Sequence, residues 1–120
     1  MTFNTPIKDA FPFIKQMICN IMNYVTAHIS EELTLSSIAA FFHKNPSYVS
    51  GRFRRETGEN LTDFIQKERM AAAIRYFNTT NMSVAEVAGN VGISDFAYFS
   101  RIFKKHIGSS PNEYKKMVNP

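Results

Sequence analysis

The chain has 120 residues, 44% of them hydrophobic, which is enough for one folded domain with its own core. It has no run of about 18 apolar residues, and its opening MTFNTPIKDAFPF lacks the basic and apolar regions of a secretory signal, so neither a membrane span nor secretion is expected. The formal net charge is +4, and Cys19 is the only cysteine, which excludes an internal disulfide and favours the cytoplasm.

Periodicity and helix-capping residues predict helices along the first half of the chain. Residues 1–12 contain two prolines without clear periodicity, so we expect them to form an N-terminal extension or linker. From Phe13 to Ile29, apolar residues recur every four positions, which predicts an amphipathic helix of about five turns. Thr34 is expected to cap a short helix, and Asn45-Pro46 should begin a longer one that ends at Gly58.

The second half of the chain shows the same signals. A long helix over about 61–78 is followed by a capping box at Ser83, whose short helix should end at Gly92. Ser94 is expected to cap a helix that ends at Gly108, and Ser110 to cap a last helical turn. The sequence therefore predicts an all-α fold of about seven helices with no strand.

Two segments repeat one pattern about 50 residues apart. LSSIA (35–39) aligns with VAEVA (84–88) at an offset of 49, whereas YVSGRF (48–53) aligns with YFSRIF (98–103) at 50. The second copy thus has one extra residue near its turn. Each copy is a short helix, a turn and a longer helix, which is the plan of a helix-turn-helix whose second helix enters the major groove of DNA. A solenoid is disfavoured, because it needs about three copies.

The longer helix of each copy is predicted to be amphipathic. Val49 and Phe53 should pack inward in the first copy, as should Phe99 and Phe103 in the second. Arg101 then points outward, where it suits a bidentate contact with a guanine edge, the alternative being a phosphate contact. The outward residues are Ser47, Ser50, Gly51 and Arg54 in the first copy, and Ala97, Ser100, Arg101 and Lys104 in the second.

The linking helix has a length that suits DNA. Residues 61–77 would span about 26 Å at 1.5 Å per residue, close to the roughly 34 Å between major-groove segments on one face of the duplex. We therefore expect a monomer to read two successive groove segments of an asymmetric site.

The sequence also resembles the DNA-binding domain of the AraC/XylS family of bacterial transcription regulators. The likeness is carried by LTLSSIAAFFHKNPSYVSGRFRRETGENLTDFIQKERMAAAIRYF and MSVAEVAGNVGISDFAYFSRIFKKHIGSSPNEYKK, and covers residues 13–117. It implies a first module over about 13–58, a linking helix over about 61–78 and a second module over about 83–117. It also implies sequence-specific promoter binding, most often for activation, with RNA polymerase as a further partner and a separate sensing or dimerisation domain in the parent protein.

The resemblance also implies which residues contact DNA. Carried over by position, the base-reading residues are Ser47, Ser50, Gly51, Phe96, Ala97 and Arg101. Contacts with the DNA backbone are expected from Ser36, Arg52, Arg54, Arg55, Ser83, Lys104 and Lys105. The sequence departs from the family pattern at the first module's reading positions, which are small here. It departs again at His43, which stands where the second copy has Gly92.

Other functions are less well supported by the sequence. The three histidines are scattered without metal-ligand spacing, and neither a catalytic triad nor a phosphate-binding loop is present, so an enzyme and a bound cofactor are not expected. The second hypothesis is a protein-interaction module that uses its basic face on an acidic transcription partner and binds DNA only loosely.

Overall fold

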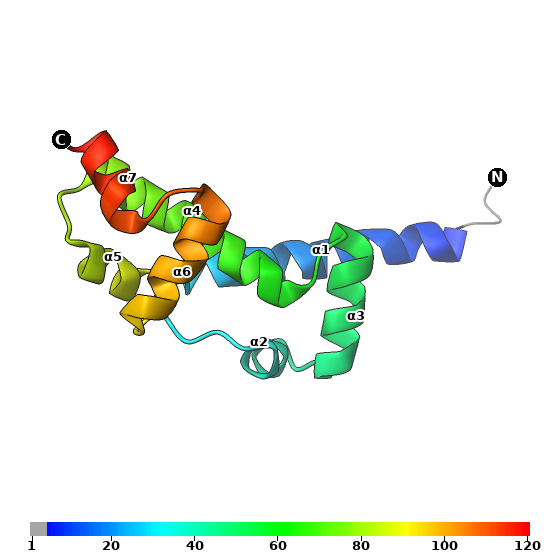
Figure 1. Cartoon of the computed structure of the whole chain (residues 1–120). Helices are drawn as coiled ribbons and strands as arrows, with labels where there is room; N and C mark the ends of the chain where they lie inside the picture. The colour runs from blue at the N-terminus through cyan, green and yellow to red at the C-terminus, as the bar shows by residue number, and fades with distance from the viewer. Residues whose placement is uncertain (1–4) are drawn as a thin grey trace. The chain divides into compact units, whose positions relative to one another are not determined.

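The computed structural model describes residues 5–120, with side chains from Phe13 onward. This part of the chain is all-α, as predicted, with seven helices and no strand (Figure 1). No helix within it is long and apolar enough to cross a membrane. The helices are α1 (Thr5–Ala27), α2 (Leu35–Phe41), α3 (Pro46–Thr57), α4 (Leu61–Thr79), α5 (Val84–Asn90), α6 (Phe96–Ile107) and α7 (Pro111–Val118).

The start of α1 differs from the expectation. Apolar periodicity placed it at Phe13, but the helix begins at Thr5. Pro6 lies in its first turn, where proline is tolerated because its missing N–H would have no intrahelical acceptor. A helix can continue beyond its apolar stripe, so periodicity was the wrong signal for this boundary. Residues 1–4 of the expected extension lie outside the described residues.

Side-chain caps set most of the other helix starts. Thr34, Asn45, Ser83 and Ser110 are the N-caps of α2, α3, α5 and α7, as predicted. The predicted cap at Ser94 is wrong, because Asp95 accepts a hydrogen bond from the Tyr98 N–H at 3.1 Å. The repeat contained the correct signal, since Asp95 is 50 residues after Asn45.

The chain divides into two compact units. Unit 1 comprises the residues up to Ala27 together with Leu33–Phe64, and unit 2 comprises His28–Glu32 and Ile65–Pro120. Helix α4 contributes its first four residues to unit 1 and the remainder to unit 2. Each unit therefore contains one copy of the repeat.

Unit 1 packs α1 and α2 against α3. The Phe53 ring is fully buried and lies 5.4 Å from that of Phe64, between centroids. The buried apolar residues of unit 1, among those described, are Ile18, Ile21, Val25, Ile38, Ala39, Val49, Phe53, Leu61 and Phe64. This core anchors α3 by one face.

Unit 2 packs α5, α6 and α7 against one another and around the C-terminal part of α4. The fully buried Phe103 contacts the rings of Phe77, Phe99 and Tyr114, with centroids 5.7 to 5.8 Å apart. The core also includes Met70, Ala72, Ala73, Val84, Val87, Ala88, Val91, Ile93 and Ile102. Phe53 and Phe103 thus anchor equivalent helices in the two units, as predicted.

The two helix pairs match closely. Helices α2 and α5 both have 7 residues, and α3 and α6 both have 12. Their connections are 42–45 and 91–95, so the second is one residue longer, as the two offsets predicted. Both turns contain the same backbone hydrogen bond of 2.9 Å. The Lys44 N–H donates to the Ala39 carbonyl in the first turn, and the Ile93 N–H donates to the Ala88 carbonyl in the second. Each unit therefore contains a helix-turn-helix.

Candidate nucleic-acid interface

Helix α3 presents the candidate DNA-reading face of unit 1. Val49 and Phe53 are fully buried, whereas Ser47, Gly51 and Arg54 are exposed and Ser50 is half-buried. The predicted outward stripe therefore lies opposite the core. It offers two hydroxyl groups and an unobstructed stretch of backbone, but no long hydrogen-bonding side chain before Arg54.

The backbone at Gly51 is open to its surroundings. A methyl group built at this position would meet no atom within 4 Å. Nothing inside unit 1 therefore requires glycine here, although glycine in a helix interior costs roughly 1 kcal/mol relative to alanine. The surface of α3 at Gly51 is therefore open to close approach from outside unit 1.

Helix α6 presents the corresponding face of unit 2. Phe99, Ile102 and Phe103 are buried, while Phe96, Ala97 and Arg101 are exposed. Phe96 leaves 47% of its surface exposed at the first position of the helix. An apolar side chain there can contact a thymine methyl group, and Arg101, further along, can donate two hydrogen bonds to guanine.

Cations are gathered in the last turn of both candidate helices. Arg54 and Arg55 lie in the last turn of α3, and Lys104 and Lys105 in that of α6; all four are exposed. Arg52 is half-buried, and its Nε is enclosed without a hydrogen-bond partner in the described part of the chain. The four exposed cations are therefore better placed than Arg52 to meet phosphate groups.

The two serines predicted to contact the DNA backbone lie at the starts of the shorter helices. Ser36 is the second residue of α2 and is exposed. Ser83 is the N-cap of α5, and its hydroxyl accepts the Glu86 N–H at 3.1 Å. Its oxygen is therefore engaged in capping, while its O–H and the backbone N–H groups of the first turn remain as donors for a phosphate.

The turns of the two helix pairs use the same backbone conformation with different residues. His43 has φ 56° and Gly92 has φ 83°, both in the left-handed region. Glycine adopts this region freely, whereas a side chain makes it costly, although short polar and histidine side chains tolerate it better than most. The departure noticed in the sequence is thus accommodated without changing the turn.

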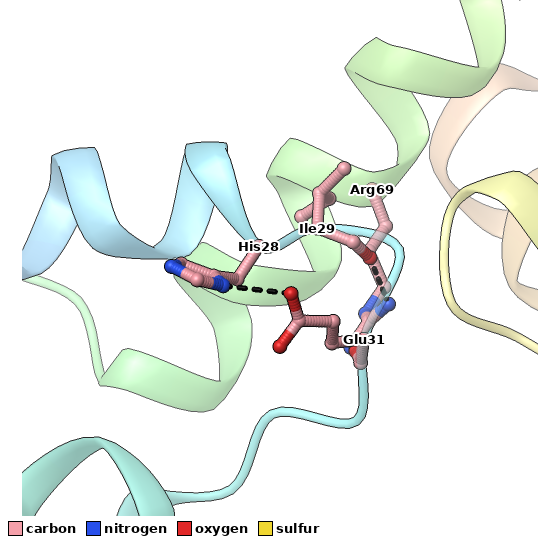
Figure 2. A network of polar contacts seen from close by, with 4 residues as sticks. All are labelled: His28, Ile29, Glu31 and Arg69. Atoms are coloured by element: carbon pink, nitrogen blue, oxygen red, sulfur yellow. Dashed lines mark hydrogen bonds and ion pairs between the residues drawn. The ribbon is translucent and has the colours of Figure 1, made fainter. Parts of the chain in front are cut away.

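Arg69, which the sequence analysis did not single out, is buried behind the turn of unit 2. It is only 8% exposed, and burial lowers the pKa of its guanidinium below the usual range. Its Nη1 donates to the carbonyls of Ile29, at 2.7 Å, and Val91, and its Nη2 donates to that of Glu31 at 3.1 Å. Figure 2 shows the guanidinium against the Ile29–Glu31 segment, beside a 2.7 Å contact between His28 Nδ1 and Glu31 Oε2.

These contacts tie the connection after α1 to the turn of the second helix-turn-helix. Gly92 is required at this turn because a Cβ there would overlap Nη1 of Arg69 and lie 2.6 Å from the Ile29 carbonyl oxygen. In the sequence Arg69 follows Lys67 and Glu68 and resembles any other charged residue of the helix, so only the fold shows its partners.

A second polar network connects α4 with α6 inside unit 2. Gln66 Nε2 donates to the Tyr98 hydroxyl at 3.0 Å, and Gln66 Oε1 lies 3.0 Å from His106 Nε2. The guanidinium carbon of Arg101 lies 5.4 Å from the centroid of the Tyr98 ring. No local sequence pattern indicates these contacts, since Gln66 is 32 residues from Tyr98 and 40 from His106.

Within the described residues, no group of three or more acidic, histidine or cysteine side chains is placed to hold a metal ion.

Comparison with known proteins identifies the family to which the chain belongs. Residues 38–117 match a helix-turn-helix domain family. The chain is 34% identical over 97 residues to the bifunctional transcriptional activator/DNA repair enzyme AdaA of Bacillus subtilis, covering 81% of this chain and 46% of that protein. It is 34% identical over 93 residues to the arabinose operon regulatory protein of Escherichia coli, covering 77% of this chain and 32% of that protein.

Solved structures agree with the sequence comparison. The DNA-binding domain of the global transcriptional factor AdpA, in complex with a target DNA, superposes with a TM-score of 0.79 at 26% identity, covering 83% of this chain and 90% of that one. The chain spans less than half the length of the curated relatives named above. The chain belongs to the AraC family of transcription regulators, and its two helix-turn-helix units are those of the family's DNA-binding domain.

Proposed function

We propose that this domain binds promoter DNA as a monomer and reads two successive major-groove segments, with α3 in one and α6 in the next. The observation that carries the proposal is the shared construction of α3 and α6. Each has one face buried by aromatic and aliphatic residues, an exposed opposite face, and exposed cations in its last turn. The structure of the AdpA domain in complex with a target DNA supports DNA binding by a domain of this fold.

The two helices divide the work between them in this proposal. Base contacts specify sequence, whereas phosphate contacts set affinity and register. Arg101 carries most of the discrimination, because it is the only long hydrogen-bonding side chain at a proposed reading position in the described α3 and α6. Phe96 and Ala97 add apolar contacts, while Ser47, Ser50 and Gly51 allow close approach with little direct readout.

The phosphate contacts come from the exposed cations in the last turns of α3 and α6. Arg54 and Arg55 serve the first module, with Arg52 on its flank, and Lys104 and Lys105 serve the second. In the whole protein, the domain would act in the bacterial cytoplasm, where promoter DNA lies. It would recruit RNA polymerase under the control of a separate sensing or dimerisation domain, and these residues would have no enzymatic role.

Selection of bound sites from a random duplex pool, followed by footprinting, tests the proposal. We expect an asymmetric site that spans about one helical turn between its two information-rich segments, with more information under α6. Arg101→Ala should cost about 1–3 kcal/mol on the best site and relax one or two base positions. Lys104→Ala, one turn further along the same helix, is the matched control and should weaken all duplexes alike.

Three outcomes would contradict parts of this proposal. A footprint confined to half a turn, or binding only to a two-fold symmetric site, would exclude the monomeric two-groove arrangement. Equal weakening of specific and random DNA by Arg101→Ala would make Arg101 a phosphate contact. Failure of selection to enrich any sequence, with only a generic salt dependence, would favour a basic protein-interaction module.

A further inference from the structure

Resting on the proposed role of Arg101, we infer that Tyr98 and Gln66 position its guanidinium for base reading. Arg101 and Tyr98 are three residues apart on α6, where side chains share a face of the helix. The guanidinium carbon lies 5.4 Å from the centroid of the Tyr98 ring, within the range of a cation–π interaction. The ring therefore provides a surface against which the guanidinium rests before DNA is bound.

The Tyr98 ring is held from outside its own helix. It is 38% exposed, so packing alone encloses it only in part. The Gln66 amide of α4 donates to its hydroxyl at 3.0 Å, which fixes the far end of the ring. Tyr98 is thus held at its backbone by α6 and at its hydroxyl by α4.

The Gln66 amide is itself oriented by a second contact. Its Oε1 lies 3.0 Å from His106 Nε2, a hydrogen bond in which the amide oxygen can only accept. His106 lies in the last turn of α6, so the amide bridges the two ends of that helix from one side. The chain of contacts runs from His106 through Gln66 and Tyr98 to Arg101.

Positioning matters here because an exposed arginine has many rotamers, and binding must select one of them. A side chain that is already restricted loses less conformational entropy when it binds, which strengthens the contact it makes. A positioned guanidinium also sharpens the preference for guanine, because a bidentate contact requires both guanidinium nitrogens in the plane of the base. Tyr98 and Gln66 are therefore positioning residues and Arg101 is the reader.

The first copy of the repeat contains a natural control. Tyr48 occupies the position equivalent to Tyr98 and is 47% exposed, but the residue three positions later is Gly51. Its ring therefore has no arginine to support at that position. Replacing Tyr48 therefore removes an exposed tyrosine from α3 without affecting a base-reading arginine three positions later.

The test is a double-mutant cycle on the selected duplex and on duplexes that change the base pair read by Arg101. Tyr98→Leu should reduce the preference for the correct base pair by about two- to fivefold, the size of an exposed cation–π interaction. It should have no further effect in an Arg101→Ala background. Tyr48→Leu should leave the preference at that base pair unchanged.

Two conservative variants isolate the anchoring step. Tyr98→Phe keeps the ring but loses the hydroxyl, and Gln66→Leu keeps the tyrosine but loses its partner. Each should lower the preference by less than Tyr98→Leu, and the two changes should not add when combined. Melting temperatures of all variants, measured alongside, show that binding is compared between folded proteins.

The outcomes separate this inference from the proposed function. If Arg101→Ala relaxes the site but the Tyr98 effect is the same with and without Arg101, the tyrosine contacts DNA itself and the inference is overturned. If Tyr98→Leu weakens every duplex equally, its role is structural and the inference again fails. If Arg101→Ala weakens all duplexes alike, the reading role of Arg101 fails first, and the positioning role fails with it.

Discussion

Gly92→Ala should destabilise unit 2 far more than the same change at another left-handed glycine. Gly92 has φ 83°, where an alanine costs about 1–2 kcal/mol. An added Cβ would also overlap Nη1 of Arg69 and come within 2.9 Å of its Cζ. The substitution therefore strains the backbone and displaces the buried guanidinium.

The magnitude follows from the bonds that the guanidinium would lose. Arg69 donates to three carbonyls in a site that leaves it 8% exposed. Loss of one hydrogen bond from a charged group costs about 1.5–3 kcal/mol. Together with the backbone strain, the expected loss is about 2.5–5 kcal/mol, a large share of the 5–15 kcal/mol that stabilises a typical domain.

Gly108→Ala is the matched control. Gly108 has φ 98°, but an added Cβ would meet no atom within 4 Å, so only the backbone cost of about 1–2 kcal/mol applies. Urea unfolding followed by far-ultraviolet circular dichroism measures both free energies. If the two substitutions cost the same within about 0.5 kcal/mol, the Arg69 contacts do not restrict this turn and the reasoning is wrong.

Three further predictions concern the helix faces and caps. Gly51→Ala and Gly89→Ala should each raise the free energy of unfolding by about 0.5–1 kcal/mol, because the added methyl meets open space in a helix; only Gly51→Ala should also weaken duplex binding in a gel-shift titration. Arg54→Ala should weaken all duplexes alike and lower the log–log salt slope by about one at most; a loss confined to one sequence would contradict a phosphate contact. The Ser83 backbone N–H holds the pKa of the Glu86 carboxyl below its ordinary value. The stability that this capping bond contributes is therefore present above about pH 4.5 and is lost as the pH falls through the lowered pKa. Glu86→Gln should therefore be less stable than the wild type at neutral pH, and the difference should shrink in acid unfolding curves.

Much of the fold could be predicted from the sequence because its signals are local. Caps and capping boxes act within three or four residues, and this is why the starts of α2, α3, α5 and α7 were correct. The error at Ser94 arose where two adjacent residues can both cap, and only Asp95 is in register with the helix. The alignment of the two copies likewise predicted that Phe53 and Phe103 are equivalent anchors.

Of the candidate site, only the outward-facing residues of individual helices could be predicted from the sequence. Spacing along a helix decides which residues point outward, so Arg101 and Arg54 were placed on the exposed faces from the sequence alone. The base contact of Arg101 and the phosphate contact of Arg54 remain predictions, because both depend on the bound DNA.

Tertiary structure alone decided the contacts between residues distant in sequence. Arg69 finds its carbonyl partners 22 to 40 residues away, and Gln66 finds Tyr98 and His106 at separations of 32 and 40. The hydrogen-bonding capacity of an arginine or a glutamine is the same on a solvated surface and in a core. Its partners are determined only when packing of the apolar faces brings distant backbone and side-chain groups within hydrogen-bonding distance.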